Sequence, residues 1–188
     1  MAHWLAGCEA EELSIYFERR ERPDPLEWSP WVLNSGYTVR REFPNHPLVG
    51  VGGVVIHHRR VLLIRRGAEP LKGQWSLPGG LLELGEELED GVRRELKEET
   101  GLEVEPLAML TVFDRIMRGG PDGQRVRYHY VIVDYVCRRK RGRLAPASDV
   151  LDARWVRRKD LPLYQLTDKA TAVILQAFEF FERRKRVP

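Results

Sequence analysis

Apolar residues gather in several short runs that are typical of β-strands. Two β-branched runs, residues 49–56 and 61–65, flank the polar segment 57–60, and this arrangement predicts a β-hairpin. Further strands are predicted at residues 75–77, 103–113, 125–137 and 153–156. Glycine-rich segments at 67–73 and 114–124 predict loops. The two long strands on either side of the loop at 114–124 are therefore expected to frame a ligand.

Two other segments have the periodicity of amphipathic helices. A helix is predicted over residues 87–100, where apolar residues recur at i, i+4 and i+8, and Gly101 then supplies a natural stop. Its apolar stripe consists of Leu88, Val92 and Leu96. A second helix should follow Thr167, whose hydroxyl can cap the first turn. Its apolar face consists of Ala170, Val173, Ile174, Ala177, Phe178 and Phe181.

The first 47 residues differ in composition from the rest of the chain. A short amphipathic helix is predicted over residues 10–20, and prolines and tryptophans follow it. We therefore divide the chain into an N-terminal extension, residues 1–47, and a main domain, residues 48–188. The extension could be a flap packed on the domain, an arm of a homodimer or a lid over a substrate, since tryptophan is frequent at interfaces.

Three acids lie on the edges of the apolar stripe of the first predicted helix. Glu95 is followed by Glu98 and Glu99 at i+3 and i+4, and each such like-charged pair costs a bare helix about 0.2–0.5 kcal/mol. Gly91, one turn earlier, costs about 1 kcal/mol more and is expected to leave open space beside the carboxylates. Arg94 can reach Glu98 one turn further on.

A bound cation would offset these costs. Mg²⁺ prefers oxygen ligands, and it commonly binds one or two carboxylates together with substrate phosphate. The turn at 77–80 comes directly before this region, and its glycines would let backbone carbonyls approach an ion. The alternative is an acidic helix face that is simply solvated.

The same stretch resembles the Nudix box, in which glycine, glutamate and the Arg-Glu-aliphatic-x-Glu-Glu-x-Gly-aliphatic run stand at fixed spacings. The matching positions are Gly80, Glu86, Arg94, Glu95, Leu96, Glu98, Glu99, Gly101 and Leu102. The resemblance implies an α/β fold, the Nudix α/β/α sandwich with a mixed β-sheet. It also implies a hydrolase that depends on Mg²⁺ or Mn²⁺ and cleaves a nucleoside diphosphate linked to another group.

The resemblance also implies roles for individual residues. Glu98 and Glu99 would be the principal metal ligands, and Glu95 would bind metal and act as the base or orient the attacking water. The Gly79 carbonyl and Asp149, with Asp152 as the alternative, would complete the metal site. Glu86 and Arg94 would support the ligands, which need partners of their own.

Candidate substrate-binding residues lie on the strands that follow the box. A nucleobase would stack on an aromatic wall, for which the candidates are Phe113, Tyr128 and Tyr130, although these could equally be ordinary sheet core. Phosphates or ribose would suit the guanidinium forks of Arg115 and Arg127. Arg65 and its neighbour Arg66 could also meet phosphate, or could lie at a solvated strand end.

The substrate is the least determined feature. Residues 112–115 and 127–134 resemble those of ADP-ribose pyrophosphatases, but the proline of many such enzymes has no counterpart at residues 116–118. ADP-ribose or a similar nucleoside diphosphate derivative is the first expectation. A nucleoside triphosphate pyrophosphatase acting on substrates such as oxidised dGTP, a nucleotide-binding regulatory module and an enzyme that removes RNA caps are the alternatives.

Composition narrows the expected partners and compartment. The chain is 43% hydrophobic and 31% charged with a net charge of +3, which is ordinary for a globular protein and does not point to nucleic acid. The basic segment 138–143 is expected to be a solvated turn. No apolar run approaches the roughly 18 residues of a membrane span. The segment 5–8 resembles a lipoprotein cleavage box, but too few residues precede it for a secretory signal. The two cysteines have no metal-site spacing and need not pair, so we expect a cytoplasmic protein. The expected partner is the small-molecule substrate that the resemblance implies.

Overall fold

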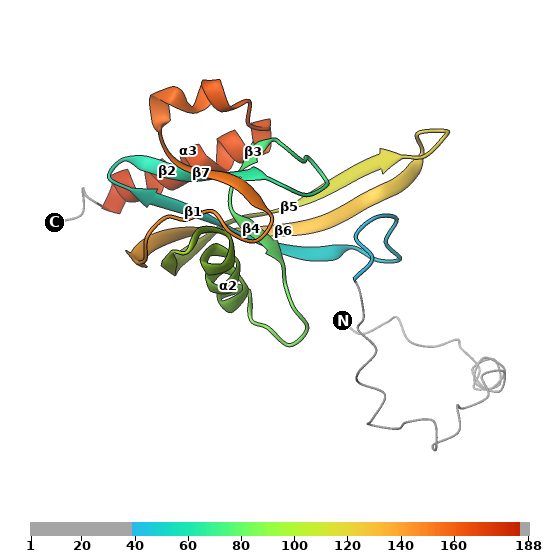
Figure 1. Ribbon diagram of the computed structural model, residues 1–188, viewed down its shortest axis with the longest axis horizontal. Helices are drawn as coiled ribbons and strands as arrows, with labels where there is room; N and C mark the ends of the chain where they lie inside the picture. Colours follow the sequence, from blue (N-terminus) through green and yellow to red (C-terminus); the bar gives the residue numbers. More distant parts are fainter. Residues whose placement is uncertain (1–38, 185–188) are drawn as a thin grey trace, which may run out of the picture. The chain divides into compact units, whose positions relative to one another are not determined.

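The computed structural model describes residues 39–184 of the chain. The predicted helix at 10–20 and most of the N-terminal extension lie outside the described residues. The chain's main compact unit comprises Arg40–Pro188. Its elements, in chain order, are β1 (Leu48–His57), β2 (Arg60–Arg66), β3 (Trp75–Ser76), β4 (Gly79–Leu81), α2 (Leu88–Thr100), β5 (Glu103–Gly119), β6 (Arg125–Arg141), β7 (Val150–Arg157), a 3₁₀ helix (Arg158–Tyr164) and α3 (Asp168–Arg184) (Figure 1).

The strands form a mixed sheet between two helical layers, as predicted. The order is β3-β2-β1-β6-β5, with β4 pairing with β1 and β7 with β2. β1 and β6 run parallel, whereas the other neighbours are antiparallel. Figure 1 shows α2 on one side of the sheet and α3 on the other. The fold is therefore the α/β arrangement expected from the sequence.

The two faces of the sheet build separate hydrophobic cores, because successive residues of a strand point to opposite faces. On β6, Val133 and Tyr135 belong to the core that α2 covers. Val136 belongs to the core that α3 covers with Val173 and Ile174. The apolar stripes predicted for both helices are therefore the surfaces that they bury.

Helix α2 packs closely on β1 through a glycine. A Cβ atom on Gly53 would lie only 2.7 and 2.8 Å from the two Cδ atoms of Leu96. The helix ends as predicted, since Gly101 has a φ of 71° and its N–H bonds to the Lys97 carbonyl at 2.9 Å. At the start of α3, the Thr167 hydroxyl accepts a hydrogen bond from the Ala170 N–H at 3.3 Å, so this cap is also confirmed.

The predicted loop at 114–124 is wrong in its first half. Residues 114–119 continue strand β5, and Arg115 and Met117 lie opposite Tyr130 and Tyr128 of β6. Pairing with a long partner strand satisfies the backbone of this segment, so the turn is confined to the glycine-rich tip. β5 and β6 consequently extend as a two-stranded ribbon beyond the rest of the sheet (Figure 1).

The basic segment expected as a turn also begins as strand. Residues up to Arg141 belong to β6. Arg138 donates to Glu105 at 2.6 Å, and Arg141 donates to Glu103 at 2.5 Å across the strand pair. Opposite charges on paired strands stabilise a sheet, which gives these side chains a structural role. Among residues 39–184, no helix has both the length and the apolar content to span a membrane.

The close packing of α2 predicts a large effect of truncating its stripe. Leu96→Ala should lower the free energy of unfolding by about 2–5 kcal/mol, because the side chain is fully buried and leaves a cavity. Leu84→Ala is the matched control, since Leu84 is fully exposed and its loss should change stability by no more than about 0.5 kcal/mol. Urea unfolding measures both, and equal losses would contradict the packing described.

Candidate active site

Arg94 holds the acids of α2 to the turn that precedes the helix. Its Nε and Nη2 atoms each donate to the Glu86 carboxylate at 2.8 Å, and Nη1 donates to Glu95 at 2.8 Å. Nη2 also donates to the Leu81 carbonyl at 3.0 Å. Such a two-pronged guanidinium–carboxylate pair is strong and fixes geometry. The hydrogen bonds from Arg94 hold the pKa of Glu86 below its ordinary value.

The expected contact of Arg94 with Glu98 is confirmed. Arg94 Nη1 donates to the Glu98 carboxylate at 3.4 Å, and the Glu98 side chain is 54% exposed. Glu86 and Glu95 are closer partners at 2.8 Å, because the turn after β4 folds back over the helix. Glu98 therefore remains available to a ligand from solvent.

The open space expected beside Gly91 is absent, because the turn after β4 folds back over α2 and fills it. Gly91 is buried, and a Cβ atom there would lie 2.9 Å from Leu82 and 3.0 Å from Glu86, with Val51 also close at 3.2 Å. The glycine lets the returning turn pack against α2, so its physical role is close approach rather than a void beside the carboxylates.

Glu99 is the most deeply buried acid of the site, with 5% of its surface exposed. Its Oε2 accepts a hydrogen bond from the Gly79 N–H at 2.8 Å. Burial raises the pKa of Glu99 to about 8; the Gly79 N–H opposes this shift, whereas the charges of Glu95 and Asp149 add to it. A carboxylate in this setting is costly to ionise unless a cation is bound beside it.

Glu95 lies beside Glu99 against the same glycine turn. A Cβ atom on Gly80 would overlap the Glu95 carboxyl, so only glycine permits this contact. Gly79 has a φ of 148° and lies so close to Val51 that a side chain there would overlap its carbonyl. Burial raises the pKa of Glu95, and its contact with Arg94 opposes that shift.

The loop before β7 brings Asp149 to this site. The Ala147 N–H donates to the Glu99 carbonyl at 3.1 Å, which ties the loop to the end of α2. Asp149 is among the charges that act on Glu99. Asp152, the alternative, pairs instead with Arg154 at 2.6 Å.

The residues present fit a hard divalent cation by their chemistry. Glu95 and Glu99 each use one carboxylate oxygen in the hydrogen bonds within residues 39–184, which leaves the other oxygen of each free. Glu98, Asp149 and the Gly79 carbonyl add further oxygen donors nearby. Over the part of the chain that the structure describes, no three His, Cys, Asp or Glu side chains already stand at ligand distances.

Four of the predicted substrate-binding residues lie on one face of the β5–β6 pair. Phe113 lies opposite Ile132, and Arg115 lies opposite Tyr130, so these predicted residues share a face with Ile132. Tyr128, two positions along, stacks on Tyr130 with 6.3 Å between ring centroids. Both tyrosines are buried with Leu48. The tyrosines thus also have the packing role that was the alternative.

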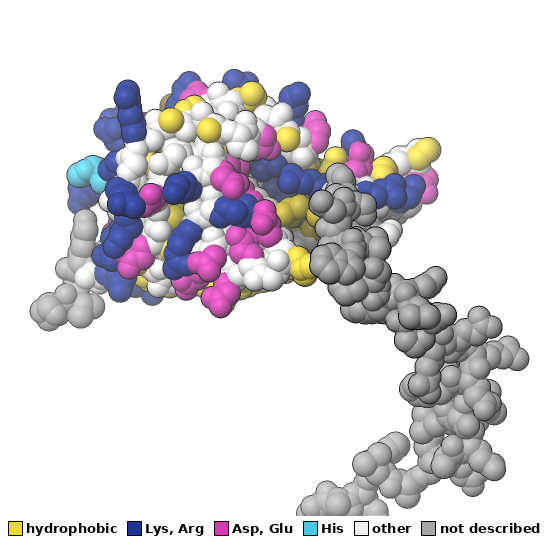
Figure 2. Space-filling view, turned by 60° about the horizontal axis from the view of Figure 1, so that its bottom comes forward, with side chains coloured by type: hydrophobic (Ala, Val, Ile, Leu, Met, Phe, Trp, Pro, Cys, Tyr) yellow, Lys and Arg dark blue, Asp and Glu magenta, His cyan; other side chains and the backbone are white. Residues whose placement is uncertain are grey.

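Arg115 and its surroundings give this face a positive character. Arg115 is half-buried, and burial together with the charge of Arg66 lowers its pKa, while Asp134 opposes the shift. Lys169, at the start of α3, stands 5.3 Å from the ring centroid of Phe113. Figure 2 shows basic and acidic side chains intermixed over the face of the molecule that it presents.

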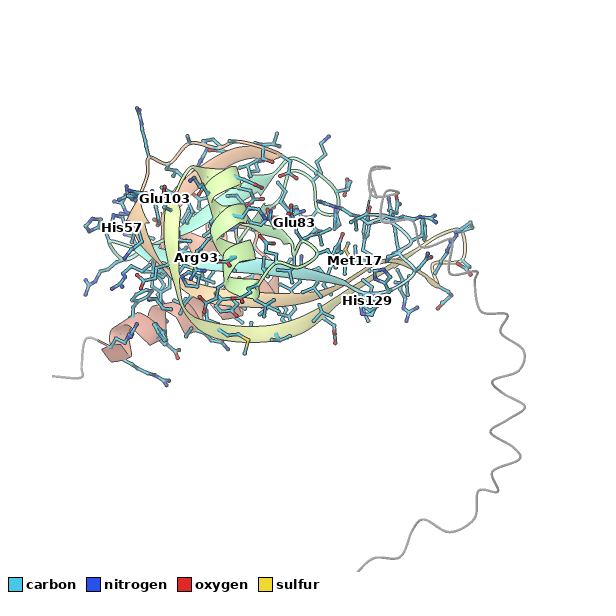
Figure 3. The ribbon with its side chains drawn as sticks, turned by 90° about the horizontal axis from the view of Figure 1, so that it is seen from below. His57, Glu83, Arg93, Glu103, Met117 and His129 are labelled. Atoms are coloured by element: carbon cyan, nitrogen blue, oxygen red, sulfur yellow. The ribbon has the colours of Figure 1, made fainter. Side chains whose placement is uncertain are left out.

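Two predicted residues lie away from this face. Arg65 is exposed and donates to the Gly73 carbonyl at 2.9 Å. Arg127 is exposed and donates to Glu42 at 2.6 Å. Figure 3 labels Met117 of β5 and His129 of β6 on the two-stranded ribbon. Arg66, the neighbour of Arg65, is the half-buried residue whose charge acts on Glu99 and Arg115.

Sequence reasoning did not single out Asp134. It lies in β6 and is only 4% exposed. Burial raises its pKa to about 6, and the charge of Arg115 opposes the shift. The signal that could have identified it is that Asp134 is the only acid within the apolar run of residues 131–137.

The burial of Glu99 predicts a pH dependence of stability in the absence of divalent cations. Below about pH 4.5 the residue is protonated in both the folded and the unfolded state. As pH rises toward about 8, the unfolded state releases this proton and the folded state keeps it, so stability falls across this window and levels off above it.

Glu99→Gln should remove this contribution. In EDTA, the variant should gain in free energy of unfolding relative to wild type by on the order of a few kcal/mol between pH 4.5 and 8. Urea unfolding at a series of pH values measures the difference, and adding Mg²⁺ should shrink it. If the free energies of unfolding of the two proteins changed with pH in parallel, Glu99 would not be a buried acid whose charge is uncompensated.

Comparison with known proteins places these features in a family. A model of the NUDIX domain matches residues 46–178. The chain is 35% identical over 117 residues to an ADP-ribose pyrophosphatase of Methanocaldococcus jannaschii, covering 62% of this chain and 66% of that protein. It is 45% identical over 76 residues to a MutT-like protein of Streptomyces ambofaciens, covering 40% of this chain and 47% of that protein.

A solved structure has the same fold. The MutT NUDIX hydrolase of Burkholderia pseudomallei superposes with a TM-score of 0.59 at 31% identity, covering 70% of this chain and 98% of that one.

Proposed function

The chain belongs to the Nudix family, and on this premise we propose that it hydrolyses the diphosphate linkage of a nucleoside diphosphate derivative such as ADP-ribose. The observation that carries the proposal is the pair of desolvated acids, Glu95 and Glu99, held against a glycine turn with Glu98 and Asp149 beside them. This crowding of negative charge is stable when cations and a polyphosphate bind to it.

Mg²⁺ or Mn²⁺, held by Glu98, Glu99, Glu95, Asp149 and the Gly79 carbonyl, would neutralise the phosphate charge and lower the pKa of bound water. The chain's own residues prepare that site. Arg94 fixes the Glu95 carboxylate through one oxygen and leaves Oε2 to orient the attacking water and accept its proton. The Gly79 N–H fixes Glu99 in the same way.

The nucleotide would bind on the β5–β6 face next to the acids. The charge of Arg66 disfavours the charged form of Arg115, and an anionic phosphate bound near Arg115 would relieve that effect. Phe113 and Ile132 supply an apolar wall for the nucleoside. The name of the Methanocaldococcus relative supports ADP-ribose as the first substrate to test.

A nucleoside triphosphate, including oxidised dGTP, is the second candidate. The MutT names of the Streptomyces relative and of the Burkholderia structure support it. The products separate the two: ADP-ribose gives AMP and ribose 5-phosphate, whereas a triphosphate gives a nucleoside monophosphate and pyrophosphate. A screen of both substrates with Mg²⁺ or Mn²⁺ and product identification by chromatography tests the proposal directly.

A homodimer remains a prediction. The exposed apolar side chains Met109, Val112 and Ile116 on β5 are consistent with a contact between two copies.

The acids of α2 provide the mutational test. Glu98→Gln and Glu99→Gln should each lower turnover at least about 100-fold while the fold is retained, because each removes a charge that would hold a cation. Glu89→Gln is the matched control, since Glu89 lies on the same helix but pairs with Arg93 at 2.7 Å, and its variant should keep wild-type turnover.

EDTA should abolish the activity, and Mg²⁺ or Mn²⁺ should restore it. Wild-type turnover in either site variant, or an activity that survives the chelator, would contradict the proposed mechanism. Circular dichroism of each variant establishes that the fold is intact.

A further inference from the structure

Asp134 is a buried acid that the fold itself does not use. It lies in the middle of β6, surrounded in sequence by apolar residues, and is 4% exposed. Within residues 39–184, its carboxylate takes part in no hydrogen bond and no ion pair. No fully buried side-chain nitrogen or oxygen in this part of the chain lacks a hydrogen-bond partner, so the free Asp134 oxygens must reach the molecular surface.

The carboxylate lies over a glycine on the neighbouring strand. Asp134 is opposite Gly52 of β1, and a Cβ atom on Gly52 would overlap its Oδ1. Gly52 in turn lies opposite Gly79 of β4. With neighbouring strands about 4.8 Å apart, the Asp134 backbone lies about 10 Å from that of Gly79, next to the proposed metal site.

The same face carries the nucleotide-binding candidates. Asp134 lies opposite Thr111 of β5, and two positions along each strand lie Phe113 and Ile132. Arg115 follows, and its charge acts on Asp134. Asp134 is therefore the acidic member of a face that otherwise offers an apolar wall and a cation.

An unpaired carboxylate in this place is costly for folding. A hydrophobic residue of similar size would pack into the core without the loss of hydration that a buried charge suffers. The carboxylate would also repel the phosphates that the nearby acids and arginines are proposed to bind. Its free oxygens accept hydrogen bonds, so they suit a neutral group that offers donors.

We propose that Asp134 is a specificity-determining residue that accepts hydrogen bonds from a pair of donors on the nucleoside part of the substrate. This inference rests on the proposed function, because it assigns the nucleoside to the face next to the metal site. Two neutral groups supply such donors, the ribose hydroxyls and the amino edge of a base. The site discriminates because a bound nucleotide without these donors would cover the oxygens and leave them unpaired.

The decisive variant is Asp134→Asn, which keeps the shape and removes the charge and one acceptor. With ADP-ribose, kcat/KM should fall about 10- to 100-fold, mostly through KM, because the lost contact is remote from the bond that breaks. Asp114→Asn is the matched control, since Asp114 lies on β5 but is exposed, and its kcat/KM should stay at the wild-type value.

Two modified substrates identify the donors. 2′-Deoxy-ADP-ribose removes a ribose hydroxyl, and inosine diphosphate ribose removes the base amino group. If Asp134 binds one of these groups, the kcat/KM of the wild-type enzyme should be about 10-fold or more lower on the analogue that lacks the group than on ADP-ribose. On that analogue, Asp134→Asn should lower kcat/KM little further. A variant whose loss is the same on all three substrates would overturn the proposal.

Stability separates this role from a structural one. Asp134→Asn should unfold at the same temperature as wild type or higher, since it removes a buried charge that has no partner in the described fold. A lower unfolding temperature, unchanged kcat/KM on ADP-ribose, or a fall in kcat with KM unchanged would each overturn the proposal.

Binding measurements keep the inference separate from the proposed function. If wild type hydrolyses no nucleotide, the proposed function fails, and calorimetry with AMP, 2′-deoxy-AMP and IMP in Mg²⁺ still tests Asp134. The expected result is AMP binding that Asp134→Asn weakens about 10-fold or more. Equal affinity of both proteins for AMP, or no AMP binding by wild type, would overturn it.

Discussion

The site depends on the desolvation of two carboxylates against a turn that only glycine can form. Glu95 and Glu99 lose water because α2 lies directly on the Gly79–Gly80 backbone, and a side chain at either glycine would collide with its surroundings. A single backbone N–H and one guanidinium compensate for part of that loss. In the free protein, protonation of Glu99 removes the remaining cost up to about pH 8. The proposed cation would compensate the ionised form, so the same contact would favour its binding.

The sheet positions this contact and the substrate face in one arrangement. β1 lies between β4, which carries the glycine turn, and β6, which carries Asp134 and the buried tyrosines. The glycine at 52 lets the Asp134 carboxylate approach the strand beside that turn. One small residue in a central strand therefore sets the spacing between the acids that would hold metal and the residues that would hold a nucleoside.

Features that depend on local sequence could be predicted, and those that depend on register could not. The helix that carries Glu95, its stop at Gly101 and the cap at Thr167 follow from periodicity and from single side chains. Whether Arg65 or Arg66 reaches the site depends on how β2 ends, which no local pattern specifies. The long pairing of β5 with β6 is a tertiary effect, and it converted residues read as loop into strand. Asp134 was overlooked because the value of an isolated acid is clear only beside Gly52 and Arg115.

The outermost strand of the sheet has a consequence for behaviour in concentrated solution. Among residues 39–184, β5 pairs with β6 alone, so along its other edge it offers backbone donors and acceptors to an extended chain. On its exposed face, Asp114 and Arg118 alternate with Val112 and Ile116, so the apolar side chains do not form a continuous stripe. Charges spaced in this way act against open-ended, fibril-like stacking of this strand on copies of itself.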